Sequence, residues 1–206
     1  AGALLCALLT FAVMPQPALA ATVTAASAND LIANIILANL NPDADTIILT
    51  ADITLTNIAV SDNNGKSGLP AISSDITIEG QGHFIKRNLN APQFRIMRVL
   101  SGTLTVVNTT ISNGNLNNAG AGGAIMNNST LIINHSTLSN NVGNIGGAIY
   151  NSGMLVINNS TLSGNSANIG GAIYSDSPAS SEAISNSVKC SRTSGSTLPI
   201  IPKSRK

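Results

Sequence analysis

The sequence predicts an all-β fold: a right-handed single-stranded parallel β-helix (a solenoid) with about 24 residues per coil and a short N-terminal capping helix. Three copies of Gly-Gly-Ala-Ile begin at Gly122, Gly146 and Gly170, so the tetrapeptide recurs at a constant spacing. The two full units, 122–145 and 146–169, agree at 15 of 24 positions. A fixed period of this length is typical of solenoids, in which each unit stacks on the next.

Short strands rather than helices are expected within each unit. Leu131-Ile132-Ile133 and Leu155-Val156-Ile157 are aliphatic or β-branched runs bounded by Gly, Asn and Ser, which are too frequent to allow a long helix. In the unit that begins at Gly146 we expect strands at 148–151, 155–158 and 160–163.

Stacking places each residue over its equivalent one period later, so apolar residues should form columns through the core. Four columns follow: Ile125, Ile149 and Ile173; Leu104, Leu131 and Leu155; Val106, Ile133 and Ile157; and Ile111, Leu138 and Leu162. The step from Leu104 to Leu131 exceeds the step from Leu131 to Leu155 by three, so three extra residues are expected in a loop within 115–121.

The excess of asparagine is expected to be structural. Asn113, Asn140 and Asn165 are predicted at turns, because Asn tolerates the left-handed backbone conformation and its amide can bond to the adjoining coils.

The repeats are preceded by weaker patterns. Runs at 46–49, 53–55, 76–78 and 96–99 predict strands of irregular early coils. Leu31, Ile32, Ile35, Ile36 and Leu40 recur at helical spacing after a cap at Ser27 or Asn29, and Asn41-Pro42-Asp43 ends the run. This helix should cover the first coil.

The chain therefore divides into four segments: a signal peptide (1–20), the cap and early coils (21–101), the regular coils (102–174), and a disordered or truncated tail (175–206). Leu4 to Val13 is apolar but too short to span a bilayer, and Ala18-Leu19-Ala20 resembles a signal-peptide cleavage site. We expect export, a mature chain that starts near Ala21 and no transmembrane segment in it. Only Cys190 would then remain, so no internal disulfide is expected.

The repeat motifs resemble those of the polymorphic outer membrane proteins, in which Gly-Gly-Ala-Ile alternates with Phe-x-x-Asn. Leu replaces Phe in Leu138-Ser139-Asn140-Asn141 and in Leu162-Ser163-Gly164-Asn165. The motif positions are Gly122, Gly123, Ala124, Ile125, Gly146, Gly147, Ala148, Ile149, Gly170, Gly171, Ala172, Ile173, Leu138, Asn141, Leu162 and Asn165. Residues 38–47 also resemble the N-terminal part of bacterial exported right-handed β-helix repeat proteins. The resemblance implies a secreted protein or one of the bacterial cell surface or outer membrane, with an adhesive role.

A catalytic role is the alternative, as a polysaccharide lyase or glycoside hydrolase of the pectate-lyase-like class. Glycoside hydrolysis normally needs two carboxylates, and lyases that use Ca²⁺ need a cluster of acidic ligands. No Asp, Glu, Lys or Arg lies between Val99 and Ser175, so we expect no catalysis in the regular coils. The early coils hold the remaining candidates: Asp45, Asp52, Asp62, Asp75, Glu79, Lys86, Arg87, Arg95 and Arg98.

Within this set, Asp52 and Asp75 each precede an Ile-Thr strand start and could stack on one edge, but their interpretation as solvated strand-start residues is favoured. His83 and His135 stand singly, which is unlike a metal cluster, so neither a metal nor another cofactor is expected.

A role in adhesion or a purely structural role is preferred over catalysis, and in the structural case the outward residues simply cover a strand face. Tyr150, Tyr174 and Met126 should point outward, opposite to the core isoleucines, and form a column on a face made of Asn, Ser and Thr. Such a column could contact a host-surface protein or a glycan. The net charge of +1 gives no reason to expect nucleic acid. If the chain is truncated, the last coil is uncapped and edge-to-edge self-association is expected.

Overall fold

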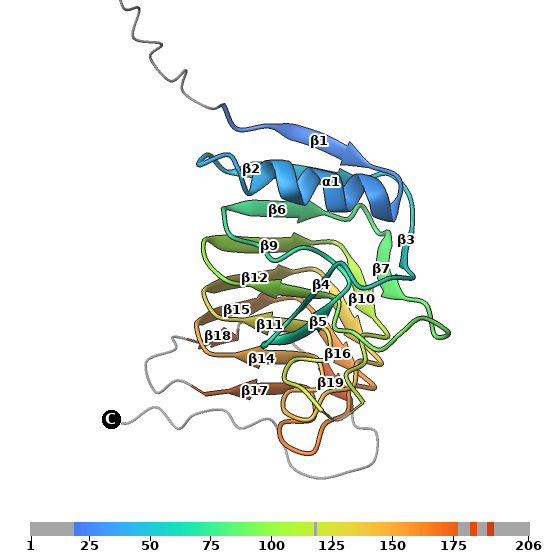
Figure 1. Cartoon of the computed structure of the whole chain (residues 1–206). Helices are drawn as coiled ribbons and strands as arrows, with labels where there is room; N and C mark the ends of the chain where they lie inside the picture. Colours follow the sequence, from blue (N-terminus) through green and yellow to red (C-terminus); the bar gives the residue numbers. More distant parts are fainter. Residues whose placement is uncertain (1–18, 118, 177–181, 185–188, 192–206) are drawn as a thin grey trace, which may run out of the picture.

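Three parallel sheets run along the molecule and form the walls of a right-handed β-helix (Figure 1). The computed structural model describes residues 19–117, 119–176, 182–184 and 189–191. Neighbouring strands of each sheet come from successive coils. Every strand pair in the three sheets is parallel. The predicted fold class is therefore confirmed.

The strands of the described residues are distributed as follows. The first sheet contains β1 (Thr22–Ala25), β2 (Asp45–Leu49), β6 (Ile76–Glu79), β9 (Thr103–Val107), β12 (Thr130–Asn134), β15 (Met154–Asn158) and β18 (Glu182–Ile184). The second contains β3 (Ile53–Leu55), β7 (Phe84–Arg87), β10 (Thr110–Ser112), β13 (Thr137–Ser139), β16 (Thr161–Ser163) and β19 (Lys189–Ser191). The third contains β8 (Met97–Val99), β11 (Ile125–Asn127), β14 (Ile149–Asn151) and β17 (Ile173–Ser175).

All four predicted core columns are confirmed by the strand register. Ile125 pairs with Ile149 and Ile149 with Ile173, and the other three columns are paired in the same way. Every column member is at most 6% exposed. Burying one such aliphatic side chain contributes about 1.5–3 kcal/mol, so these columns supply much of the stacking energy.

The three extra residues lie where the sequence places them. Asn115 pairs with Val142, whereas Ala121 pairs with Ile145, so the offset between paired residues shortens by three from the first bridge to the second. The early coils are longer than the predicted period, since the step from Ile47 to its partner Ile78 exceeds the step from Ile133 to Ile157. The constant period therefore describes the later repeats only, because loops between the early strands add length.

The predicted helix is α1 (Ala28–Ala38), and its cap is Ser27, whose Oγ accepts a hydrogen bond from the Asp30 amide at 3.2 Å. Leu31, Ile35 and Ala38 are buried against the first coil. The helix contacts β1, β2 and β3 and covers that end of the core (Figure 1). Strand β1, which the sequence did not predict, forms the edge of the first sheet beside it.

A hairpin outside the three sheets was also not predicted. Strands β4 (Val60–Asp62) and β5 (Gly65–Ser67) pair antiparallel. Asp62-Asn63-Asn64-Gly65 is a hairpin-turn signal, but its flanking strands are short and contain no apolar run.

One turn prediction is wrong. Asn113 and Asn140 have positive φ values of 62° and 55°, as expected, but the next member of this column is Gly164, with φ 64°. Asn165 is one residue further along and is equivalent to Asn141. Both side chains are buried, and Asn141 Nδ2 donates to Asn165 Oδ1 at 2.9 Å. Asn165 therefore stabilises the stack from inside.

The tail contains two further strands. β18 pairs with β15 and β19 pairs with β16, so the expectation of a disordered tail does not hold for these two segments. Residues 177–181, 185–188 and 192–206 of the tail lie outside the described residues, as do residues 1–18 of the expected signal peptide.

Candidate functional site

The third sheet brings the three predicted binding residues into one column. Met126 pairs with Tyr150, and Tyr150 pairs with Tyr174. In β14 the flanking Ile149 and Asn151 are buried while Tyr150 is partly exposed, because successive side chains of a strand point to opposite faces. We call Met126, Tyr150 and Tyr174 the ladder.

The two tyrosine rings of the ladder stack, with centroids 5.6 Å apart and an interplanar angle of 17°. Both hydroxyls point to one carboxylate: Tyr150 Oη donates to Asp176 Oδ2 at 2.7 Å, and Tyr174 Oη lies 3.4 Å from Asp176 Oδ1. Burial, and then the hydrogen bond and charge of Asp176, raise the pKa of Tyr150 to about 12. Its hydroxyl is therefore a protonated donor at neutral pH.

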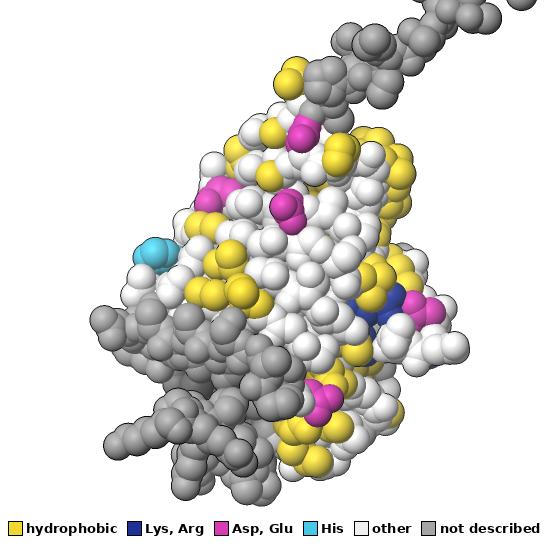
Figure 2. All heavy atoms as spheres, turned by 90° about the vertical axis from the view of Figure 1, so that its left-hand side faces the viewer, with side chains coloured by type: hydrophobic (Ala, Val, Ile, Leu, Met, Phe, Trp, Pro, Cys, Tyr) yellow, Lys and Arg dark blue, Asp and Glu magenta, His cyan; other side chains and the backbone are white. Residues whose placement is uncertain are grey.

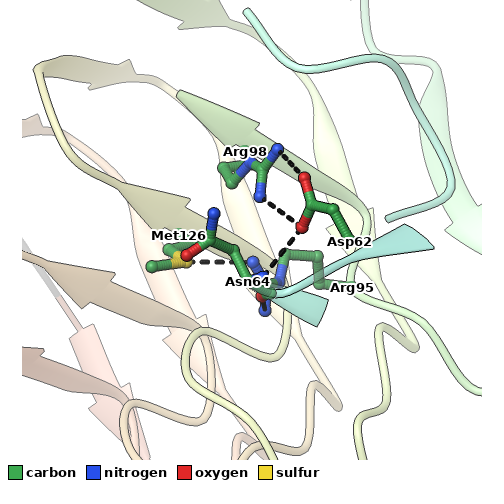
Figure 3. A network of polar contacts seen from close by, with 5 residues as sticks. All are labelled: Asp62, Asn64, Arg95, Arg98 and Met126. Atoms are coloured by element: carbon green, nitrogen blue, oxygen red, sulfur yellow. Dashed lines mark hydrogen bonds and ion pairs between the residues drawn. The ribbon is translucent and has the colours of Figure 1, made fainter. Parts of the chain in front are cut away.

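Arg98 continues the column beyond Met126. Its guanidinium donates from Nη1 and Nη2 to the two carboxylate oxygens of Asp62, at 2.9 and 2.7 Å, and so connects β8 to the β4–β5 hairpin (Figure 3). The hydrogen bond from Arg98 is the main cause that holds the pKa of Asp62 below its ordinary value. The hairpin thus closes this end of the column.

Arg95 lies beside this ion pair and is only 1% exposed. Its Nη2 donates to the Asn64 carbonyl at 2.7 Å, and its Nη1 lies 3.0 Å from Met126 Sδ (Figure 3). Burial, and then repulsion by Arg98, lower the pKa of Arg95 to about 10, so the side chain stays charged at neutral pH. The ladder consequently has two arginines and one carboxylate at its Met126 end and a carboxylate at its Tyr174 end.

The face shown in Figure 2 is mostly uncharged, with polar side chains and backbone between small apolar areas. Carboxylates are scattered over it instead of gathering in one place. This agrees with the absence of charged residues from Val99 to Ser175 in the sequence.

Asp52 and Asp75 do not stack on one edge; both are exposed residues at strand starts, which is the interpretation favoured from the sequence. Asp52 precedes β3 in the second sheet, and its Oδ1 lies 3.0 Å from Nδ1 of His83. Asp75 precedes β6 in the first sheet, and its Oδ1 accepts a hydrogen bond from the Thr103 amide at 2.7 Å. The shared Ile-Thr pattern marks strand starts, but these belong to different walls of the coil.

The two histidines occupy separate places. His83 and its partner Asp52 are both partly exposed, at 33% and 52% of their side chains. His135 is a corner residue with φ 49°, in line with Asn108 and Asn159, which have φ 48°. Its Nε2 lies 3.3 Å from Asn159 Nδ2. His135 therefore takes a position that asparagine occupies in the neighbouring coils.

The other early-coil candidates make local contacts. Glu79 accepts from the Gln81 amide at 3.2 Å, Lys86 Nζ lies 4.1 Å from the Phe84 ring centroid, and Arg87 Nε donates to the Asn113 carbonyl at 2.8 Å. Asp45, which is buried, accepts from the Ala21 amide.

Within the described ranges, no three His, Cys, Asp or Glu side chains are grouped so that they could hold a metal ion. The same part of the chain has no helix that is long and apolar enough to cross a membrane.

The repeat-motif residues serve the stacking. The Gly123 amide donates to the Gly146 carbonyl at 3.1 Å, and the Gly147 amide donates to the Gly170 carbonyl at 3.2 Å. Directly after the motif, Asn127 Nδ2 donates to Asn151 Oδ1 at 2.6 Å inside the coil. The tetrapeptide thus sets the register of each coil on the next.

Comparison with known proteins found no matching family model, no matching curated protein and no matching solved structure. The sheet topology and the ladder define the class of the molecule. It is a right-handed parallel β-helix that carries a stacked tyrosine pair on its third sheet.

Four residues around the ladder were not expected there: Arg98, Arg95, Asp62 and Asp176. Extending the column of Met126 back by one coil reaches Arg98, so the spacing carried a signal for that residue. Asp62 and Arg95 lie in coils without a constant period, and no pattern indicated that Asp62 would bond to Arg98 or that Arg95 would contact Met126.

Proposed function

We propose that this chain is an exported, non-catalytic bacterial β-helix protein that attaches to a partner through the ladder on its third sheet. The observation that carries the proposal is the stacked pair Tyr150 and Tyr174, partly exposed in line with Met126. Export is supported by the apolar N-terminal stretch and Ala18-Leu19-Ala20. The resemblance of the repeats to polymorphic outer membrane proteins supports a cell-surface or secreted location and an adhesive role.

The stacking favours a host-surface protein over a glycan as the partner. A sugar ring packs on an open aromatic face, but Tyr150 and Tyr174 turn faces toward each other at 5.6 Å. The ladder therefore offers ring edges, the Tyr174 face that is turned away from Tyr150, and the Met126 side chain. Aromatic residues, Met and Arg are the types enriched where protein surfaces meet. The buried Arg95 and Arg98 fix the Met126 end of this surface without long mobile side chains.

The test is attachment of the Tyr150→Ala, Tyr174→Ala double variant to host cells and to a glycan array. We expect attachment to cells to fall at least tenfold while the circular dichroism stays unchanged. Met154→Ala is the matched control, because Met154 is an exposed apolar residue, 45% exposed, on the first sheet. Attachment equal to that of the unmodified chain would disprove the role of the ladder.

Two further readouts belong to the same test. Binding to the array, together with undiminished attachment to protease-treated cells, would make the partner a glycan. Release of oligosaccharides from a panel of polysaccharides would overturn the non-catalytic part of the proposal and favour a lyase or hydrolase.

A further inference from the structure

Asp45 is a buried carboxylate without a basic partner among the described residues. Its side chain belongs to β2 and is 3% exposed. The two ion pairs in the described part of the chain join His83 to Asp52 and Arg98 to Asp62. The donors to Asp45 Oδ1 are neutral groups, the Ala21 amide at 2.7 Å and Asn41 Nδ2 at 3.0 Å. A buried charge that is balanced only by neutral donors is costly, and a cation at this position would offset the cost.

The nearest donor is the nitrogen that export would convert into a cation. Ala21 follows Ala18-Leu19-Ala20, the cleavage pattern of the expected signal peptide. Leu19 is 82% exposed, and Ala20 and Ala21 are exposed as well. The Ala20–Ala21 bond is therefore accessible while the Ala21 nitrogen already lies against Asp45.

The surroundings hold Ala21 in place on both sides. Its carbonyl accepts a hydrogen bond from the Thr46 amide at 2.8 Å, next to the β1–β2 pairing. A cavity of about 150 Å³ adjoins the nitrogen and is lined by Leu37, Ala38 and Asn41. Leu37 and Ala38 end α1, and the C-terminal end of a helix carries partial negative charge that favours a cation.

We propose that removal of residues 1–20 creates an α-ammonium group at Ala21 that forms a partly buried ion pair with Asp45 and locks the first coil. A peptidase adds water across the Ala20–Ala21 peptide bond, which leaves a carboxylate on Ala20 and a protonated amine on Ala21. The bond from Asn41 Nδ2 to the Leu19 carbonyl, 3.2 Å, is lost, while the bond from Asn41 to Asp45 remains. This inference rests on the export part of the proposed function.

The test compares two forms of chain 21–206 that differ only in charge. One form has a free amine at Ala21, and the other is acetylated there, so that it keeps an amide donor as the unprocessed chain does. We expect the free form to melt about 5 °C higher at pH 6.5, because a charge-assisted bond is stronger than a neutral one. The difference should vanish in Asp45→Asn and persist in Asp43→Asn, whose carboxylate lies two residues away.

Equal melting temperatures for the two unsubstituted forms would overturn the proposal, and so would an undiminished difference in Asp45→Asn. The first comparison needs no substitution, so it stands even if Asp45→Asn fails to fold. Mass spectrometry of the full chain after export from a bacterial host should give Ala21 as the first residue, and any other start would contradict the processing step. Neither readout measures attachment, so failure here is distinguishable from failure of the ladder.

Discussion

Asp62 and Arg98 form a two-point ion pair that holds the β4–β5 hairpin against the third sheet. The four atoms meet at 2.9 and 2.7 Å, and the Arg98 side chain is 3% exposed while that of Asp62 is 37% exposed. The two residues are 36 positions apart in the sequence. One exposed hairpin residue thereby neutralises a charge that β8 buries beside the ladder.

Replacing Asp62 by Ala should lower the thermal midpoint at neutral pH, because Arg98 would remain buried without its counter-ion. The pKa of Asp62 is below its ordinary value of 3.8 in the folded chain. The stabilisation is therefore present above pH 3.8 and is lost as pH falls through the lowered value. Thermal unfolding measured from pH 7 down to pH 2 should show the two proteins converging at the acid end. A gap that stays constant with pH would contradict this assignment, and Asp43→Asn serves as the control.

Replacing Asn141 by Ala should destabilise the chain by about 2–3 kcal/mol in urea unfolding, because several buried groups lose partners at once. Asn141 Oδ1 accepts from the Gly114 amide at 2.9 Å, and its Nδ2 donates to Asn165 Oδ1 at 2.9 Å. The matched control is Asn168→Ala. Asn168 donates to Asn144 Oδ1 at 2.8 Å on the exposed surface, and its loss should stay within about 0.5 kcal/mol. Similar costs at both positions would disprove the importance of the internal stack.

Replacing Gly146 by Ala should cost more than about 2 kcal/mol, because strain and overlap add. Gly146 has φ 66°, and a Cβ there would overlap the carbonyl oxygen of Ile149. Gly82 has φ 90° but no atom within 4 Å of an added Cβ, so Gly82→Ala should show the strain alone, about 1 kcal/mol. Chemical unfolding of both variants measures the difference. Equal costs would mean that close packing of the repeat glycine contributes nothing.

The ionisation of Tyr150 can be followed by ultraviolet absorbance in a Tyr174→Phe variant, since the chain has two tyrosines. We expect a midpoint near pH 12 and a lower midpoint when Asp176 is replaced by Asn. A raised pKa means that stability is complete below pH 10.0, the ordinary value, and is lost as pH rises through the folded value. If Asp176→Asn left the midpoint unchanged, burial alone would account for the shift.

Much of the regular region could be predicted from the sequence because its contacts repeat. The columns of Leu104 and Ile125 and the three extra residues between Asn115 and Ala121 follow from counting along the chain. The same counting places Tyr150 beside Tyr174. The turn was wrongly assigned to Asn165 because the residue equivalent to Asn140 is Gly164. Asn165 is instead equivalent to the adjacent Asn141.

The sequence by itself determined the fold, the core columns of the regular coils and the ladder. In a solenoid each side chain contacts the equivalent side chain of the next coil, one period along the sequence. Only the tertiary structure decided which partner each charged side chain meets: Arg98 with Asp62, His83 with Asp52, and Asp45 with the amide nitrogen of Ala21. Ala21 and Asp45 are 24 residues apart in the register of β1 on β2, whereas the first two pairs join coils whose loops differ in length, so no constant period relates them. Their partners are selected by burial and by the path of the loops, which are properties of the folded chain.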